Sequence, residues 1–199
     1  MAILGAVACG RTIFSAKGRA GIWLIASVFL ALAGPEASAQ AEVSREYQVK
    51  AVFLFNFAQF VDWPPGAFSN PQAPLVIGVL GDDPFDGYLD ETVRGEKLNN
   101  RPFVVQRYRR VEEIENCQVL FIGQTGSHRL EHILDALKGR SILTVGDMEG
   151  FAQDGGIIRF ITKDNRIRFR INVEAAEAAH LVISSKLLRL AEIVTPEKD

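Results

Sequence analysis

Three short apolar runs alternate with helical patterns through the middle of the chain, and this alternation restricts the fold more than any other feature. The runs occupy residues 75–80 (LVIGVL), 119–122 (VLFI) and 141–145 (SILTV), and turn residues bound them. Such runs are typical of strands buried on both faces, as in parallel sheets covered by helices. A further strand is expected at 103–108. The pattern predicts an α/β fold with a mostly parallel central sheet flanked by helices.

Two helices are expected between these strands. Asp83 is expected to cap the first, with Pro84 as its first residue, because both positions favour these residue types. The second is expected over residues 127–138, with Ser127 as its N-cap and Gly139 at its end. Its apolar stripe consists of Leu130, Ile133, Leu134 and Leu137.

The segment after residue 156 alternates apolar and polar residues with period two. Residues 157–162 and 166–171 flank a short turn at 164–165, which predicts a C-terminal β-hairpin added to the sheet. The chain is then expected to close with segments 173–182 and 184–194, of which the second is capped by Ser184.

One face of the expected hairpin is rich in arginine. If Lys163 pairs with Arg166, then Arg159 lies directly opposite Arg170. Like charges at a cross-strand pair are destabilising. This face must therefore meet solvent, acidic neighbours of the same chain or an acidic partner.

Residues 45–65 (REYQVKAVFLFNFAQFVDWPP) predict a helix that Pro64 and Pro65 end. Most of its apolar side chains gather on one side at 100° per residue, and polar side chains occupy the opposite arc. Val52 and Phe55 are exceptions, because they fall within the polar arc. An apolar side chain there is either an ordinary exposed residue or a contact for another molecule.

The N-terminal region has the pattern of a secretory signal. Arg11, Lys17 and Arg19 precede an apolar stretch at residues 22–33, and a small-x-small site ends at Ala39. The apolar stretch is shorter than the ~20 residues of a spanning helix, so cleavage after Ala39 is favoured over a retained anchor. We therefore expect an exported protein whose residues 40–199 form a single domain.

Charge and cysteine content narrow the function further. The formal net charge of the whole chain is −2, and removal of the basic signal makes it more acidic, so nucleic acid is not an expected partner. Cys9 leaves with the signal, so Cys117 has no partner for an internal disulfide. We expect Cys117 to pack as a small apolar residue at the start of a strand.

The candidate ligand motifs are weak. Asp82 and Asp83 follow a strand as in a phosphoacceptor pocket, but such a pocket needs a further Asp, a Lys and a phosphodonor. Capping already accounts for Asp83. Residues 123–128 form either an anion site at a helix N-terminus or a tight turn. The turn is favoured because only Arg129 adds positive charge alongside.

Catalytic and metal-site interpretations are weaker still. Ser127 and His128 are adjacent in sequence and point about 100° apart on a helix. His128 and His132 share a helix face, but no third zinc ligand is evident. Ser184 and Lys186 lack the S-x-x-K spacing of a serine–lysine nucleophile. We therefore expect no catalytic, metal or cofactor site.

Several blocks of the sequence resemble the YfiR-like family in the same order along the chain. The first is residues 47–64 (YQVKAVFLFNFAQFVDWP). The others are residues 79–85 (VLGDDPF), 95–102 (GEKLNNRP), 143–147 (LTVGD), 151–160 (FAQDGGIIRF), 167–172 (IRFRIN) and 183–190 (ISSKLLRL).

The resemblance implies a periplasmic inhibitor that binds the periplasmic sensor domain of an inner-membrane diguanylate cyclase. It also implies a sequestering partner at the outer membrane, such as a lipoprotein, whose action raises cyclic di-GMP and favours biofilm formation. Better-known members carry paired cysteines, whereas only Cys117 remains here after cleavage, so disulfide control does not carry over. A homodimer is left open.

The expected function is therefore protein binding. The predicted partner contacts are the apolar residues Phe55, Trp63, Phe68 and Tyr88 and the polar residues Arg168 and Arg170, although Trp63 equally suits a plug at the end of the core. The alternative is a periplasmic small-ligand sensor that uses the strand-end loops at 81–82, 123–127 and 146–147.

Overall fold

The structure is a computed structural model that describes residues 36–164 and 166–194. From Glu42 onward the chain forms one compact unit. The predicted signal segment lies outside the described residues except for positions 36–39, which begin helix α2 (Glu36–Gln59). Within the described part of the chain, no helix combines the length and apolar character needed to cross a bilayer.

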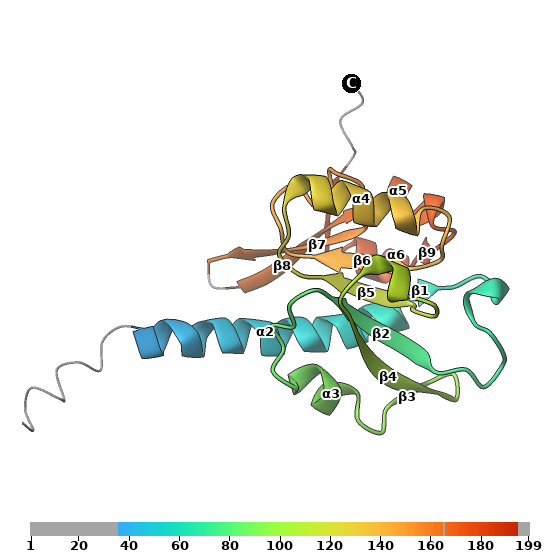
Figure 1. The fold of residues 1–199 in the computed structure, drawn as a ribbon, viewed down its shortest axis with the longest axis horizontal. Helices are drawn as coiled ribbons and strands as arrows, with labels where there is room; N and C mark the ends of the chain where they lie inside the picture. The colour runs from blue at the N-terminus through green and yellow to red at the C-terminus, as the bar shows by residue number, and fades with distance from the viewer. Residues whose placement is uncertain (1–35, 165, 195–199) are drawn as a thin grey trace, which may run out of the picture. The chain divides into compact units, whose positions relative to one another are not determined.

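An eight-stranded sheet forms the centre of the unit, with the strand order β10-β8-β7-β6-β5-β2-β4-β3 (Figure 1). All neighbours are parallel except the β3–β4 and β7–β8 pairs. The predicted mostly parallel sheet with an added C-terminal hairpin is therefore confirmed. Its strands are β2 (Leu75–Leu80), β3 (Lys97–Leu98), β4 (Arg101–Tyr108), β5 (Val119–Ile122), β6 (Leu143–Gly146), β7 (Ile158–Lys163), β8 (Arg166–Asn172) and β10 (Glu192–Val194).

Short helices and a second, two-stranded sheet complete the fold. In the small sheet, β1 (Val61–Asp62) pairs antiparallel with β9 (Val182–Ile183). The remaining elements are α3 (Tyr88–Val93), α4 (Ser127–Leu137), α5 (Val173–Ala178), α6 (Ser185–Leu188) and the 3₁₀ turns η1 (Pro65–Ala67) and η2 (Val111–Glu113).

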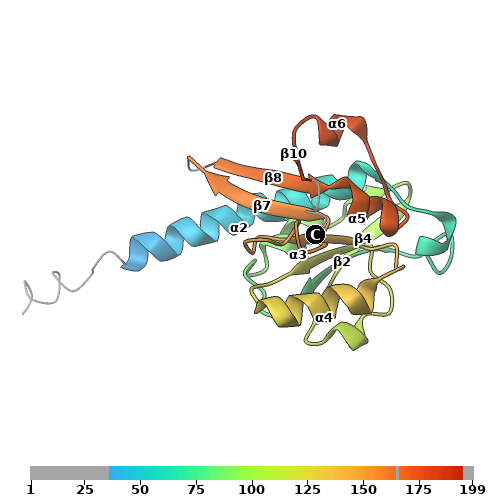
Figure 2. The same ribbon diagram turned by 90° about the horizontal axis from the view of Figure 1, so that it is seen from above.

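Each face of the central sheet has its own core, and α2 and α4 lie on opposite sides of the sheet in Figure 2. Successive residues of β2 point to opposite faces: Ile77 joins the α2 side, and Val76 joins the α4 side. On the α2 side, Phe57 packs against the hairpin, with ring centroids 5.6 Å from Phe160 and 5.2 Å from Phe169. Because both faces are covered, β2 and β5 are apolar at every position but Gly78.

The hairpin has the predicted register. Lys163 pairs with Arg166, and Arg159 lies opposite Arg170. The repulsion expected between the two arginines is relieved on one side, because Arg170 Nε donates to Glu192 on β10 at 2.9 Å. An acidic neighbour of the same chain therefore meets part of the arginine face.

Two predicted helix boundaries are wrong, namely the end of the first helix and the start of the second. Helix α2 ends at Gln59, before Pro64 and Pro65 are reached, because Val61 pairs with Ile183 in the small sheet. Asp83 does not cap a helix. Its carboxylate accepts a hydrogen bond from the Phe85 N–H at 2.8 Å, which forms a turn, and α3 begins only at Tyr88.

Further differences concern the later helices. The N-cap of α4 is Gly126 and not Ser127. Ser184 does cap α6, since its side chain accepts from the Lys186 N–H at 3.3 Å. However, this helix ends at Leu188, and β10 follows because it gains a parallel partner in β8. Helix α5 ends at Ala178, short of the predicted segment end at 182.

Cys117 is buried beside β2, with 4% of its surface exposed, as predicted for a small apolar residue. Its Sγ lies 3.1 Å from the carbonyl oxygen of Val119. The space is tight, because a Cβ on Gly78 would approach the Cys117 Sγ to 2.8 Å. Burial raises the pKa of the Cys117 thiol to about 12.

We predict that Cys117 does not react with a thiol reagent such as DTNB near pH 8 while the protein is folded. The raised pKa keeps the thiol neutral at this pH, and only the thiolate is nucleophilic. The absorbance of the thiolate that DTNB releases on reaction should not rise until urea unfolds the chain. Fast labelling of the native protein would contradict the buried position.

Candidate functional site

The order of the parallel strands reverses direction at β2. The chain runs from β2 to β4 on one side and then returns to β5 on the other side of β2. Leu80 and Ile122 are the last paired residues of β2 and β5. At such a switch point the following loops leave in opposite directions, and a crevice opens outside the carboxyl ends of the strands.

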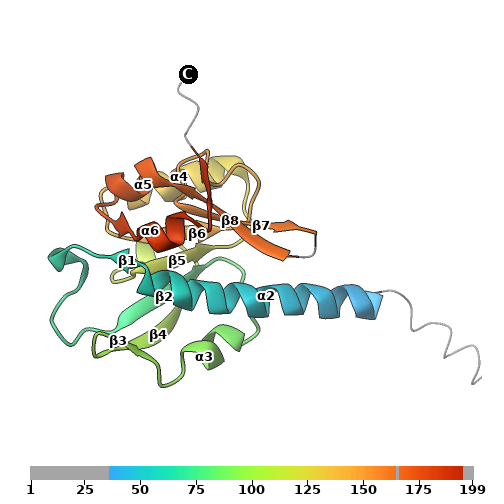
Figure 3. The same ribbon diagram turned by 180° about the vertical axis from the view of Figure 1, so that it is seen from behind.

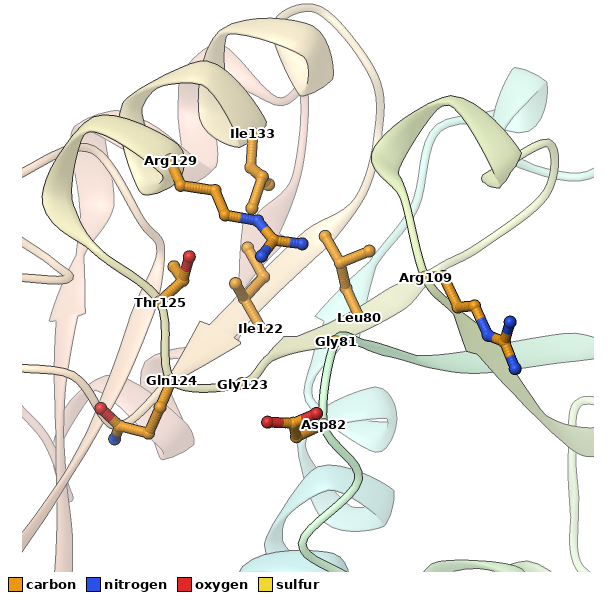
Figure 4. A pocket seen from close by; sticks show the side chains of 10 residues that line it. All are labelled: Leu80, Gly81, Asp82, Arg109, Ile122, Gly123, Gln124, Thr125, Arg129 and Ile133. Atoms are coloured by element: carbon orange, nitrogen blue, oxygen red, sulfur yellow. The ribbon is translucent and has the colours of Figure 1, made fainter.

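The structure has a crevice of about 350 Å³ at this point (Figure 4). Two of the three strand-end loops that the sequence proposed for a small ligand, 81–82 and 123–127, meet here. The close approach of the loops depends on Gly123, where a Cβ would lie 2.9 Å from the Asp82 carbonyl oxygen. The crevice is lined by Leu80, Gly81, Asp82, Arg109, Ile122, Gly123, Gln124, Thr125, Arg129 and Ile133.

The third of these loops, residues 146–147, contributes Asp147 to a buried polar cluster beside the crevice. Lys50 of α2 lies 2.6 Å from Asp147 Oδ2 and 2.6 Å from Glu46 Oε1. The Lys50 side chain is 3% exposed and that of Asp147 8% exposed. A buried charge requires such partners, because removing it from water is costly.

Asp147 also accepts two neutral hydrogen bonds. Tyr47 OH donates to its Oδ2 at 2.8 Å, and Gln124 Nε2 donates to its Oδ1 at 2.9 Å. Burial, followed by the negative charge of Asp147, raises the pKa of the Tyr47 phenol, which therefore stays protonated as a donor. Gln124 is also among the residues that line the crevice, but its side chain points away from Arg129 in Figure 4, so its loop rather than its amide joins the two sites.

The predicted apolar contact residues are less exposed than expected, except Tyr88, which is 37% exposed. Phe55 is half-buried against Phe103, with ring centroids 5.0 Å apart. Trp63 and Phe68 contact each other edge to face at 6.4 Å. Both also pack against the main core, which agrees with the alternative that Trp63 closes its end.

The two predicted polar contacts lie on β8. Arg168 is exposed, whereas Arg170 forms an ion pair with Glu192. The structure thus brings Trp63 and Phe68 together, places Tyr88 on α3 and leaves the arginines on the hairpin. A role for these residues in partner binding stays a prediction.

The histidines considered as metal ligands lie at the surface of α4. Among the described residues, no three His, Cys, Asp or Glu side chains are placed to hold a metal ion together. His128 and His132 are both exposed on α4. Sequence reasoning missed the Lys50–Asp147 pair, whose only local signal is Glu46 one turn before Lys50.

We predict that Lys50→Ala lowers the free energy of unfolding by about 3–5 kcal/mol, because it leaves Asp147 buried without its counter-charge. Urea unfolding of both proteins measures the change. Lys138→Ala is the control, since Lys138 also lies 2.6 Å from a carboxylate but is 79% exposed, and its loss should change stability little. Equal effects of the two substitutions would contradict the structural role of the cluster.

Comparison with known proteins places this fold in a family. A search of the curated proteins finds no match. The family model described as YfiR/HmsC-like matches residues 47–192, which run from Tyr47 of α2 to the first residue of β10. The match includes the crevice, the Lys50–Asp147 pair and every predicted contact residue. The chain therefore belongs to the YfiR/HmsC-like family.

Proposed function

We propose that this protein is a periplasmic regulator that binds the periplasmic sensor domain of an inner-membrane diguanylate cyclase and inhibits the enzyme. Inhibition would lower cyclic di-GMP and biofilm formation. The observation that carries this proposal is the family match over residues 47–192. The signal-like N-terminal region supports the periplasmic location. An outer-membrane lipoprotein that sequesters the protein is part of the same proposal.

We further propose that it acts by binding and not by catalysis. Asp147 is the most heavily bonded carboxylate near the crevice, and Lys50, Tyr47 and Gln124 occupy its oxygens. A carboxylate that is buried and held by three donors is poorly placed to accept a proton from a substrate. The geometry of the cluster suits a structural anchor.

The best-organised candidate contact is formed by Trp63 and Phe68. The Arg101 guanidinium lies 3.9 Å from the centre of the Phe68 ring, and the three residues line a cavity of about 160 Å³. Trp63 Nε1 is buried without a hydrogen-bond partner in the described part of the chain. Aromatic and arginine side chains are the usual energetic centres of protein interfaces. An acceptor group of the cyclase would fit this donor.

We predict that the full chain, co-expressed with a diguanylate cyclase that has a periplasmic sensor domain, co-purifies with it from membranes and lowers cellular cyclic di-GMP. Cyclic di-GMP is quantified by mass spectrometry, and a cyclase without its sensor domain serves as the control. A folded, exported protein that leaves every such cyclase of its own genome unbound and fully active would refute the proposed function.

The arginine face gives a sharper test of the interface. We predict that Arg168→Glu weakens binding to the sensor domain by about tenfold, which corresponds to about 1.4 kcal/mol, without lowering the melting temperature. Arg168 is the cleaner choice, because a glutamate at Arg170 would face Glu192. Arg189→Glu, at another exposed site, is the matched control. Unchanged affinity of the Arg168 variant would remove the hairpin from the interface.

A further inference from the structure

We propose that the crevice between β2 and β5 binds a small organic anion. Its carboxylate or phosphate group would lie at the α4 side of the crevice, near Arg129 and Thr125. Its apolar body would lie over the floor formed by Leu80, Ile122 and Ile133. This site does not depend on the proposed cyclase partner, and its test needs only the purified protein.

The charge of the crevice is the first reason. Arg109 and Arg129 come from different parts of the chain, and neither forms an ion pair within the described residues. In Figure 4, Arg129 extends from α4 over the crevice, whereas the guanidinium of Arg109 points away from it on the opposite side. Arg129 is therefore the anchor. The sequence alone placed no second basic residue near this loop.

Asp82 fixes the orientation of the ligand. Its carboxylate stands at the rim formed by the β2 loop, apart from Arg129 in Figure 4. A second negative charge close to Asp82 would be repelled. The anionic group should therefore lie toward α4, and the rest of the ligand should extend toward the β2 loop.

Unsatisfied polar groups lie on the same side as Arg129. The Thr125 hydroxyl oxygen is buried and has no hydrogen-bond partner among the described residues. The Thr125 N–H donates to the Met148 sulfur at 3.2 Å and to no other acceptor in the described part of the chain, and a thioether is a weak acceptor. Buried donors without good partners cost free energy, and an anionic oxygen would satisfy them.

The start of α4 adds to this arrangement. The helix has 11 residues, begins after Gly126 without a side-chain cap and has no acidic residue in its first turn. Arg129 instead places a positive charge there, which is unfavourable beside the positive end of the helix dipole. An anion at this position would offset both charges.

Size and polarity define the ligand class. A volume of about 350 Å³ is near the lower end of small-molecule sites. Leu80, Ile122 and Ile133 are nearly completely buried and form the small apolar part of a mostly polar lining, which a bare inorganic ion would leave uncovered. The best fit is an anionic group attached to a compact apolar body, such as one ring.

The test uses phenyl phosphate and benzoate as probes, with inorganic phosphate and neutral benzyl alcohol as comparisons. Binding to the full chain is followed by NMR shifts of backbone amides. We expect at least one of the ring-bearing anions to bind with a Kd on the order of 1 mM or lower and to shift residues 123–130. We expect inorganic phosphate and benzyl alcohol to bind more weakly. If phenyl phosphate binds more tightly than benzoate, the ligand is a phosphate ester. If benzoate binds more tightly, the ligand is a carboxylate.

Variants separate the proposed contacts from general charge effects. Arg129→Gln and Thr125→Val should each raise the Kd of the more tightly bound anion by about tenfold or more, whereas Arg189→Gln should leave this Kd unchanged. Circular dichroism checks that each variant is folded. The proposal is overturned if neither anion shifts residues 123–130 at about 10 mM, or if Arg129→Gln and Arg189→Gln have equal effects.

Discussion

The ion pair between Lys50 and Asp147 is the interaction on which the arrangement of the fold depends. It joins two residues 97 positions apart, one in the middle of α2 and one directly after β6. Apolar packing specifies the position of α2 on the sheet less sharply than a paired charge, because the hydrophobic effect is non-directional. The buried pair adds a directional contact that favours one register. Helix α2 then lies along the sheet from the hairpin to β1 (Figure 3), and Glu46 also accepts from Thr162 of the hairpin at 3.1 Å.

With α2 fixed on one face and α4 on the other, the loops at the carboxyl ends of the strands have little freedom. Gly123 brings the β5 loop against Asp82, and Gln124 turns toward Asp147. The crevice is thus held by rigid elements on both sides, which is the usual condition for a preorganised site. The family match extends over this whole arrangement and not over one motif.

Local patterns predicted what depends on local periodicity. The buried strands β2 and β5 and the register of Arg159 against Arg170 followed from apolar runs and from period-two alternation. Patterns failed where distant segments meet. Nothing near Val61 indicates its pairing with Ile183, and β10 exists because β8 offers it an edge. The site was predictable to the same extent, because the sequence identified the loops. The Lys50–Asp147 pair and the buried Thr125 hydroxyl required the fold.

Gln124 connects the loop beside the crevice to the Lys50–Asp147 pair that holds α2. Its loop borders the crevice, whereas its side chain points away from Arg129 in Figure 4 and donates to Asp147, which holds Lys50. A ligand that displaced the Gln124 loop from Asp147 would remove one donor from this carboxylate and weaken the attachment of α2. A ligand that left the loop in place would favour the attached form. A ligand shifts such an equilibrium only by the difference in its affinity for the two arrangements. If α2 contributes to a partner surface through Phe55, occupancy of the crevice then changes partner affinity, and reciprocity requires that the partner change ligand affinity by the same factor.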